Sequence, residues 1–178
     1  MLIRLSERWA TFELLAAALL ALAVTCLILL NVVTRSLGAA LFWVDELAIY
    51  AMVWMTFLGA SAAVHYGHSI SITVATDALP PKLAAAAARI VDLVVFAFAL
   101  LMLWFCWMWF LPFEIIRFGF DAQAFQGETF NFIYAEPTTT LGIPKWWVWM
   151  VMWLFALGTT LHATANLVRP NRPRQAAA

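Results

Sequence analysis

Charged side chains are scarce in this chain. Lysine, arginine, aspartate and glutamate make up 11% of its 178 residues, against roughly 25% in soluble domains. Hydrophobic residues make up 65%, and the mean hydropathy is +0.89. The charges cancel to a net charge of zero, and the basic residues form no stripe for nucleic acid. The composition therefore excludes an ordinary soluble domain, gives no sign of a nucleic-acid partner, and indicates an integral protein of the lipid bilayer.

Common catalytic and ligand-binding motifs are absent from the sequence. It holds no Gly-rich phosphate loop, no Gly-x-Ser-x-Gly elbow and no His-Glu-x-x-His zinc motif. Its two cysteines, Cys26 and Cys106, lie inside apolar runs, which is typical of small buried hydrophobic residues. We therefore predict that the chain is not an enzyme and binds no cofactor or metal.

Four apolar runs are each close to the about 20 residues that a helix needs to cross a bilayer. The predicted spans cover approximately residues 12–33, 44–64, 93–111 and 146–168. The first run is too long for a signal peptide and has no convincing cleavage site after it, so we interpret it as a retained span. The sequence predicts an all-α membrane protein with a single four-helix domain over residues 1–178.

The segments outside the spans are predicted to be a loop, a helix extension, an amphipathic connection and a tail. Residues 112–145 form the longest loop, on the outer side of the membrane. Pro80-Pro81 begins an alanine-rich run that extends the third helix or lies along the membrane surface. In Ser69–Thr76, apolar and hydroxyl residues alternate, which predicts an amphipathic cytoplasmic connection between the second and third helices, in contact with the membrane or a partner. Residues 170–178 are predicted to be a flexible cytoplasmic tail.

The basic residues predict the orientation. With the N-terminus inside, seven of the ten flank cytoplasmic ends of the spans, and only Arg35, Arg117 and Lys145 lie outside. This asymmetry follows the positive-inside rule, so we predict that both termini lie in the cytoplasm. The outer side is then aromatic and acidic, with Trp43, Trp107, Trp109, Trp146, Trp147, Trp149, Asp45, Glu46, Glu114, Asp121, Glu128 and Glu136. It is either a docking surface or an ordinary set of interfacial anchors and solvated charges.

Few ionisable residues lie in or beside the spans, where they are costly and are the default functional candidates. Glu13 is expected at the inner end, within reach of the headgroups. Arg89 and Asp92, three residues apart, are expected to pair, and Asn31 and Arg35 lie one turn apart at the outer end. None lies at the midplane, where a carrier places its coupling residue. This distribution argues against a stand-alone carrier or efflux protein, which stays a third alternative.

The three histidines, His65, His68 and His162, are all expected near the cytoplasmic side, where His65 and His162 can approach each other. Two facing histidines can ligate a haem, so a haem-binding membrane anchor of a redox complex is the main alternative function. Such sites place their histidines within the spans, however, whereas His65 and His68 lie where the second span ends. A structural or interfacial role is therefore preferred to a haem or a His-x-x-His metal site.

The ends of the second span carry the most specific pattern. In chain order it consists of Phe42-Trp43-Val44-Asp45-Glu46-Leu47, Trp54, Phe57-Leu58-Gly59-Ala60 and Gly67-His68-Ser69-Ile70. It extends back to Asn31-Val32-Val33-Thr34-Arg35 and forward to Leu141-Gly142-Ile143-Pro144-Lys145-Trp146. In order and spacing these residues resemble the DctQ-like small membrane subunit of tripartite ATP-independent periplasmic (TRAP) transporters, over nearly the whole chain.

The resemblance implies a non-catalytic subunit of a sodium-coupled transporter in the bacterial inner membrane, in which residues 112–145 are a periplasmic loop. In that family a periplasmic solute-binding protein captures an organic acid or related solute, and a large multi-span permease subunit moves it inward. The small subunit is expected to brace the scaffold of the large one and to help form the docking face for the binding protein. His65 stands where the family often has a basic residue, and residues 119–134 are longer and more aromatic than in compact members. The subfamily and the solute therefore stay open.

Ten residues are predicted to form subunit interfaces or to fix the span ends: Asn31, Arg35, Trp43, Asp45, Glu46, Trp54, Gly59, Gly67, His68 and Pro144. Asp45 and Glu46 lie in the first turn of the second helix, where a carboxylate gains about 0.3–1 kcal/mol from the helix dipole. We expect Glu46 to make a further polar contact, with Arg35 as the candidate partner. Gly67 is expected to be a left-handed helix cap, and residues 59–63 offer small side chains for packing on the large subunit or within the bundle.

Overall fold

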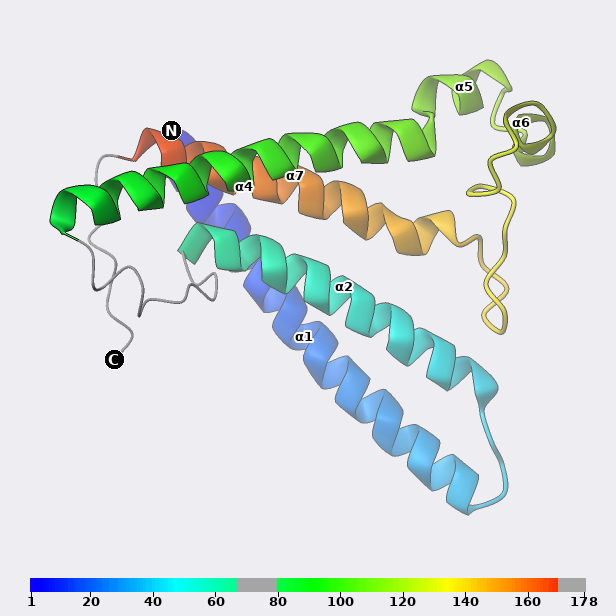
Figure 1. Cartoon of the computed structure of the whole chain (residues 1–178). Helices are drawn as coiled ribbons and strands as arrows, with labels where there is room; N and C mark the ends of the chain where they lie inside the picture. The colour runs from blue at the N-terminus through cyan, green and yellow to red at the C-terminus, as the bar shows by residue number, and fades with distance from the viewer. Residues whose placement is uncertain (67–79, 170–178) are drawn as a thin grey trace.

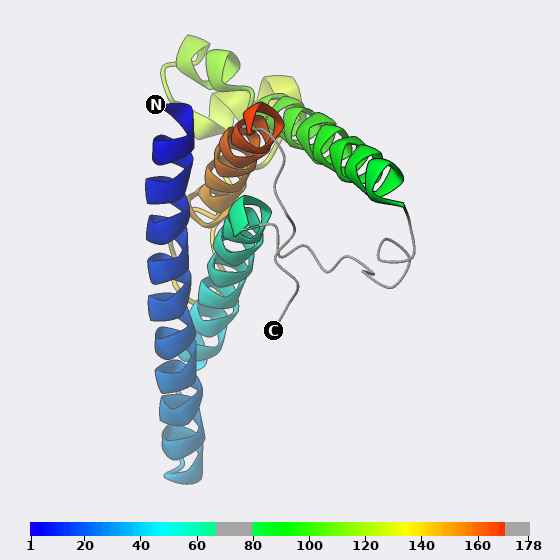
Figure 2. The ribbon, with the colours of Figure 1, turned by 90° about the vertical axis from the view of Figure 1, so that its left-hand side faces the viewer.

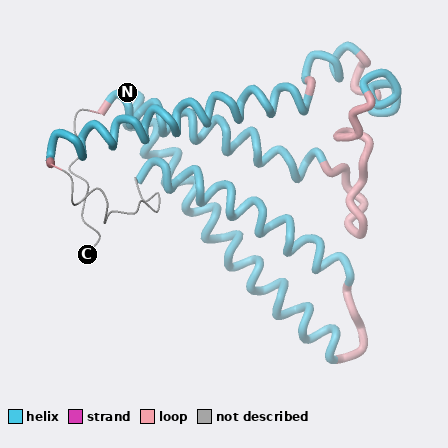
Figure 3. Tube along the Cα trace, viewed as in Figure 1, coloured by secondary structure: helices cyan, strands magenta, loops and turns pink. Residues whose placement is uncertain are grey.

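The computed structural model describes residues 1–66 and 80–169. Its helices are α1 Leu2–Ser36, α2 Phe42–Tyr66, α4 Pro81–Phe110, α5 Pro112–Arg117, α6 Ala122–Thr129 and α7 Trp146–Val168. Within the described residues there is no strand, and the one isolated bridge pairs Pro137 with Pro144. Figure 3 shows helix along nearly all of the described chain, with the longest loop between α6 and α7. The prediction of an all-α protein is confirmed.

Four of the described helices are long and apolar enough to cross a membrane. α1 has 35 residues, which at 1.5 Å per residue gives about 52 Å, against about 30 Å for the hydrocarbon core. The helices therefore extend beyond the predicted spans. α4 begins at Pro81, in the first helical position that proline favours, so the alanine-rich run is the first part of this helix. Gly67, His68, the 69–76 connection and the 170–178 tail lie outside the described residues.

The long helices form two antiparallel pairs, α1 with α2 and α4 with α7. α2 and α7 run in the same direction and join the pairs. Figure 1 shows the pairs close together where α1 begins and diverging toward the turn between α1 and α2. Figure 2 shows α1 at one edge and α4 at the other, with α2 and α7 between them. We call the end where α1 begins the N-terminal end, and the end with the α1–α2 turn the turn end.

Large apolar side chains cover the outside of the bundle. Leu15, Leu19 and Leu22 on α1, and Val94 and Leu101 on α4, each expose more than half of their surface. Hydrocarbon is a suitable surrounding for such side chains, because the backbone polar groups are already bonded within the helices. The faces of α1 and α4 that carry these residues therefore suit contact with lipid or with another apolar helix.

The main apolar core cluster lies at the turn end and consists of Phe110, Ile115, Phe125 and Ile133. It forms because Leu111 adopts a left-handed conformation (φ 42°) and Pro112 then starts α5, so the chain turns sharply after α4. The hydroxyl of Tyr134 donates to the Phe110 carbonyl at 2.7 Å, and burial raises the pKa of this phenol. Residues 111–134 thus fold as a helical cap over α4 and α7.

Candidate functional site

Glu46 fastens the loop before α7 to the start of α2. Its Oε1 accepts from the Thr139 N–H at 2.8 Å and from the Tyr50 hydroxyl at 2.8 Å. Its Oε2 accepts from the N–H and the hydroxyl of Thr140, both at 2.6 Å, and from the Leu141 N–H at 3.1 Å. One carboxylate therefore holds three successive residues of the loop. We call Glu46 and residues 139–141 the Glu46 clamp.

The loop that Glu46 holds is itself tightly folded. The Thr138 N–H donates to the Ile143 carbonyl at 2.8 Å, and the Lys145 ammonium lies 2.5 Å from the Glu136 carboxylate. Gly142 has a φ of +69°, which a residue with a side chain adopts only under strain. Pro144 forms the bridge to Pro137, and its carbonyl accepts from the N–H of Trp147 in the first turn of α7. The loop is thus fixed relative to both α2 and α7.

Asp45 connects the two helices of the first pair. Its carboxylate accepts from the Asn31 side-chain amide and, at 2.5 Å, from Nη2 of Arg35. The Arg35 Nε donates to the Asn31 Oδ1 at 2.9 Å. The predicted contact between Glu46 and Arg35 is therefore wrong. Adjacent residues on a helix do not face the same neighbour, so Asp45 faces α1 while Glu46 faces the loop.

The other predicted interface residues lie apart from one another. Trp43 is 40% exposed, and the indole N–H of Trp54 donates to the Val148 carbonyl at 2.8 Å. Gly59 faces open space, since a Cβ there would meet nothing within 4 Å. In the small-residue segment, Ser61 and Ala62 are fully buried, so this part of α2 packs within the bundle.

A second polar group of side chains, which sequence reasoning did not assemble, lies at the N-terminal end. Ser6 Oγ lies 2.7 Å from Nδ1 of His65 and 2.8 Å from Nδ1 of His162, and Nε2 of His162 lies 2.9 Å from Oε2 of Glu13. We call Ser6, Glu13, His65 and His162 the inner polar cluster. The expectation that Glu13 reaches the headgroups is wrong, because its side chain has no exposed surface. The signal available in the sequence was spacing: Ser61 and His65, and His162 and Asn166, are each four residues apart.

Gly158 on α7 lets the helices approach closely beside this cluster. A Cβ there would lie 2.8 Å from Nε1 of Trp9, 2.6 Å from Oγ of Ser61 and closer still to Oε1 of Glu13. Within the described residues, these three buried atoms have no hydrogen-bond partner. An indole donor, a carboxylate acceptor and a hydroxyl therefore converge beside a residue with no side chain.

The geometry of the two histidines does not favour a haem site. Their ring centroids are 5.2 Å apart, which confirms that His65 and His162 approach each other. Both Nδ1 atoms, however, are within hydrogen-bond distance of the same Ser6 hydroxyl, and Nε2 of His162 is within hydrogen-bond distance of the Glu13 carboxylate. The Ser6 hydroxyl thus lies where a haem iron between two Nδ1 ligands would have to be. Nor do three or more His, Cys, Asp or Glu side chains come together as a possible metal site in the described part of the chain.

Arg89 on α4 caps the end of α7. Its guanidinium donates to the carbonyls of Arg169 at 2.9 Å, Leu167 at 3.1 Å and Asn166 at 3.4 Å. Carbonyls at a helix C-terminus lack intrahelical partners and attract cations. The expected pairing of Arg89 with Asp92 is therefore wrong, because the guanidinium is directed toward α7.

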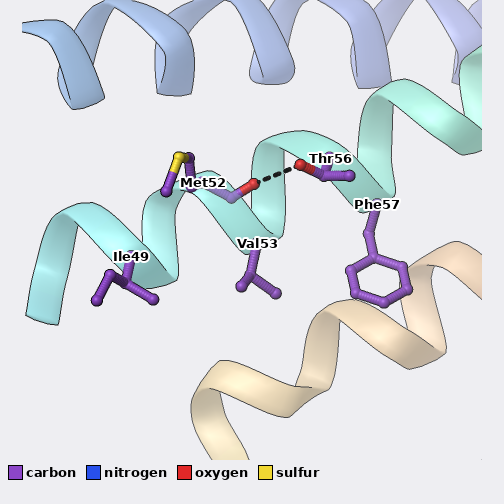
Figure 4. Close-up of a pocket in the computed structure, with 5 residues that line it drawn as sticks. All are labelled: Ile49, Met52, Val53, Thr56 and Phe57. Atoms are coloured by element: carbon purple, nitrogen blue, oxygen red, sulfur yellow. Dashed lines mark hydrogen bonds between the residues drawn. The ribbon is translucent and has the colours of Figure 1, made fainter.

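An apolar hollow of about 280 Å³ opens on α2 where the helix pairs diverge, lined by Ile49, Met52, Val53, Thr56 and Phe57. Figure 4 shows Ile49, Val53 and Phe57 pointing toward α7. Phe57 packs edge-on against Phe155 with 5.2 Å between ring centroids. The Thr56 hydroxyl is bonded to the Met52 carbonyl of its own helix at 2.8 Å. The lining therefore offers no charged group to an anionic solute.

Comparison with known proteins identifies a matching family and a relative. Residues 24–172 match the family model described as tripartite ATP-independent periplasmic transporters, DctQ component. A Haemophilus influenzae protein, named as a TRAP transporter small permease protein, is 36% identical over 70 residues, which is 39% of this chain and 43% of the relative. No solved structure matches the chain. Because the family model covers most of the chain, including the Glu46 clamp, the chain belongs to the DctQ component family of TRAP transporters.

Proposed function

We propose that the chain is the small, non-catalytic membrane subunit of a sodium-coupled TRAP transporter for an organic acid or related solute. It braces the scaffold of a large multi-span permease subunit and helps form the docking face for a periplasmic solute-binding protein. Membership of the DctQ family supports this proposal. The solute is selected by those two partners and not by this chain.

The observation that carries the proposal is the Glu46 clamp. It fixes residues 139–141 at the turn end, where Asn31, Arg35 and Asp45 also tie α1 to α2. The clamp joins the two diverging helix pairs at their far ends, which stiffens the bundle. A rigid apolar bundle with a fixed polar face at one end is what a scaffold and docking subunit requires.

The distribution of charge in the long helices supports a brace over an autonomous carrier. Toward the turn end they carry Arg35, Asp45 and Glu46, and toward the N-terminal end they carry Arg4, Glu7, Arg8, Glu13, His65, Lys82, Arg89, Asp92 and His162. The middle of each helix has no Asp, Glu, Lys, Arg or His. A carrier needs a coupling residue near the midplane. In the orientation we propose, the protein lies in the inner membrane with the turn end in the periplasm and both termini in the cytoplasm.

The test uses the chain co-expressed with its large subunit and assayed in proteoliposomes with the binding protein. We expect sodium-driven solute uptake by the wild type. Glu46→Ala should lose most of this uptake, because residues 139–141 are no longer held by the Glu46 clamp. Glu128→Ala is the matched control, since Glu128 is an exposed glutamate in the same extramembrane region. Co-purification with the large subunit is measured in the same samples.

Three results would contradict the proposal. Failure of the wild-type chain to co-purify with any large subunit would remove the bracing role. Uptake that continues without a sodium gradient would remove the coupling. Uptake by Glu46→Ala equal to that of Glu128→Ala would show that the clamp does not contribute to docking.

A further inference from the structure

A chain of hydrogen bonds between side chains crosses the N-terminal end of the bundle. It runs from His65 on α2 to Ser6 on α1, then to His162 on α7 and finally to Glu13 on α1, with successive distances of 2.7, 2.8 and 2.9 Å. Ser6, Glu13 and His162 are fully buried, and His65 is 4% exposed. Ionisable groups inside a membrane protein are costly and are functional candidates. The bracing role does not use them.

The donors and acceptors limit how hydrogens can be arranged in this chain. The Ser6 hydroxyl has one hydrogen, so it donates to at most one of the two Nδ1 atoms and accepts from the other. If Glu13 is ionised, Nε2 of a neutral His162 donates to it, and Nδ1 of His162 must accept from Ser6. Ser6 then accepts from the Nδ1–H of His65. Reversing all three bonds gives the second arrangement, in which Glu13 is protonated and donates to His162.

We propose that the inner polar cluster is a proton-binding site, in which one proton passes from His65 through Ser6 and His162 to the carboxylate of Glu13. A hydronium ion of the bulk water gives its proton to Nε2 of His65 and leaves as water, and the Nδ1–H proton of His65 passes to Ser6 Oγ. The original Ser6 hydrogen passes to Nδ1 of His162, whose Nε2–H passes to Oε2 of Glu13. Within the cluster three bonds to hydrogen break and four form, and the fourth bond that breaks is the O–H bond of the hydronium ion. The cluster therefore gains one proton, and Glu13 becomes a neutral carboxylic acid.

The burial of the four side chains indicates where the proton enters the cluster and why its binding is favourable. His65 is the member of the cluster with some exposure, and it lies in the last turn of α2. Glu13 lies at the other end of the chain of bonds with none. Because an ionised carboxylate is unfavourable in a medium of low dielectric constant, the bound proton removes a buried charge.

The space beside the second oxygen of Glu13 suits a proton better than a metal ion. Trp9 Nε1, Ser61 Oγ and Glu13 Oε1 all lie close to the position of a Gly158 Cβ. Ser61 can donate to an ionised carboxylate or accept from a protonated one. The indole N–H of Trp9 is a donor only, so it would point its hydrogen at a cation.

The other charged groups that the structure describes near this end of the bundle are exposed or bonded elsewhere. On α1 they are exposed, namely Arg4, Glu7 and Arg8. From α4, Arg89 is bonded to carbonyls in the last turn of α7, and Asp92 is half-buried. Among the described residues, the ion pair of Glu13 is with His162, and α2 contributes only His65. In the described part of the chain, the ionisable groups that contact one another within the cluster are therefore Glu13 and the two histidines.

The test is infrared difference spectroscopy of the full chain in lipid nanodiscs between about pH 8 and about pH 5, the range in which histidine titrates. We expect the C=O stretching band of a buried carboxylic acid to appear at acid pH. The band should be absent from Glu13→Gln and present in Glu7→Gln, the exposed control on the same helix. Ser6→Ala keeps the Glu13–His162 pair but removes the hydroxyl between the two histidines. After a pH jump, the rate at which the band appears should therefore fall by at least about tenfold.

A second measurement on the wild type does not depend on any variant folding. The imidazole nitrogen resonances of His162 should show a neutral ring at both pH values, with its hydrogen on Nε2 at high pH and on Nδ1 at low pH. An imidazolium at His162 with Glu13 still ionised would overturn the assignment of the proton to the carboxyl. A band that persists in Glu13→Gln, the absence of any such band, or unchanged kinetics in Ser6→Ala would overturn the site or the relay.

Discussion

The indole N–H of Trp54 donates a hydrogen bond of 2.8 Å to the main-chain oxygen of Val148. This bond joins α2 to the first turns of α7, close to where the helix pairs diverge. Interhelical hydrogen bonds in membranes stabilise by about 0.6 kcal/mol on average and by up to about 1.7 kcal/mol. It is therefore a modest but specific link between two helices that run in the same direction.

Trp54→Phe removes the donor and keeps an aromatic ring, so we expect a loss of about 0.6–1.7 kcal/mol in the free energy of unfolding. Unfolding of the chain in mixed micelles, followed by circular dichroism, measures it. Trp43→Phe is the control, because the Trp43 side chain is 40% exposed. An equal loss in both variants would show that ring size and not the hydrogen bond is responsible.

The ion pair of Arg35 and Asp45 should be weak in spite of its 2.5 Å distance. The two side chains are 56% and 41% exposed, and exposed pairs contribute about 0–1 kcal/mol. A double-mutant cycle with Arg35→Gln and Asp45→Asn should give a coupling below about 1 kcal/mol that decreases with added salt. A larger, salt-independent coupling would mean that a partner or the headgroup layer removes water from the pair.

The contacts of Asp45 and Glu46 and those of the inner polar cluster show how much of the structure one sequence can predict. Four spans follow from the apolar runs, and the approach of His65 to His162 follows from their position at the same end of neighbouring helices. The partner of Arg35 does not follow, because Asp45 and Glu46 are adjacent and only the rotation of α2 about its axis decides which faces α1. Glu13 and His162 are 149 residues apart in sequence. Their pairing depends on the register of α1 against α7, which no local pattern specifies.

Arg89→Gln should loosen the end of α7. Glutamine has one amide group in place of the guanidinium that reaches three carbonyls, so those carbonyls lose donors and the last turn frays. Hydrogen–deuterium exchange of residues 163–169 should become faster, with little change in residues 146–155. Lys82→Gln, at an exposed position in the first turn of α4, should leave exchange in α7 unchanged. Uniformly faster exchange along α7 would indicate lost packing and not a lost cap.

Gly158 and Gly59 give a matched pair of substitutions. Gly158→Ala places a methyl group against Trp9, Ser61 and Glu13 at distances that require movement. The three contacted side-chain atoms are buried, so these side chains or α1 must shift, and we expect a loss of about 1–3 kcal/mol in the free energy of unfolding. Gly59→Ala meets nothing within 4 Å and should be neutral or stabilising by about 0.5 kcal/mol, because alanine favours a helix.

The same pair tests where the proposed large subunit binds. Gly59 is open in the isolated chain, so an effect of Gly59→Ala on co-purification with the large subunit, without a loss of stability, would place the interface on that face of α2. Gly158 lies inside the bundle, so Gly158→Ala should reduce co-purification only in proportion to the loss of folded protein. If Gly59→Ala leaves assembly unchanged, that face of α2 contacts lipid, and the exposed apolar face of α4 becomes the expected site of contact. The corresponding test there is Leu101→Ala, a residue that is 54% exposed, measured by the same co-purification.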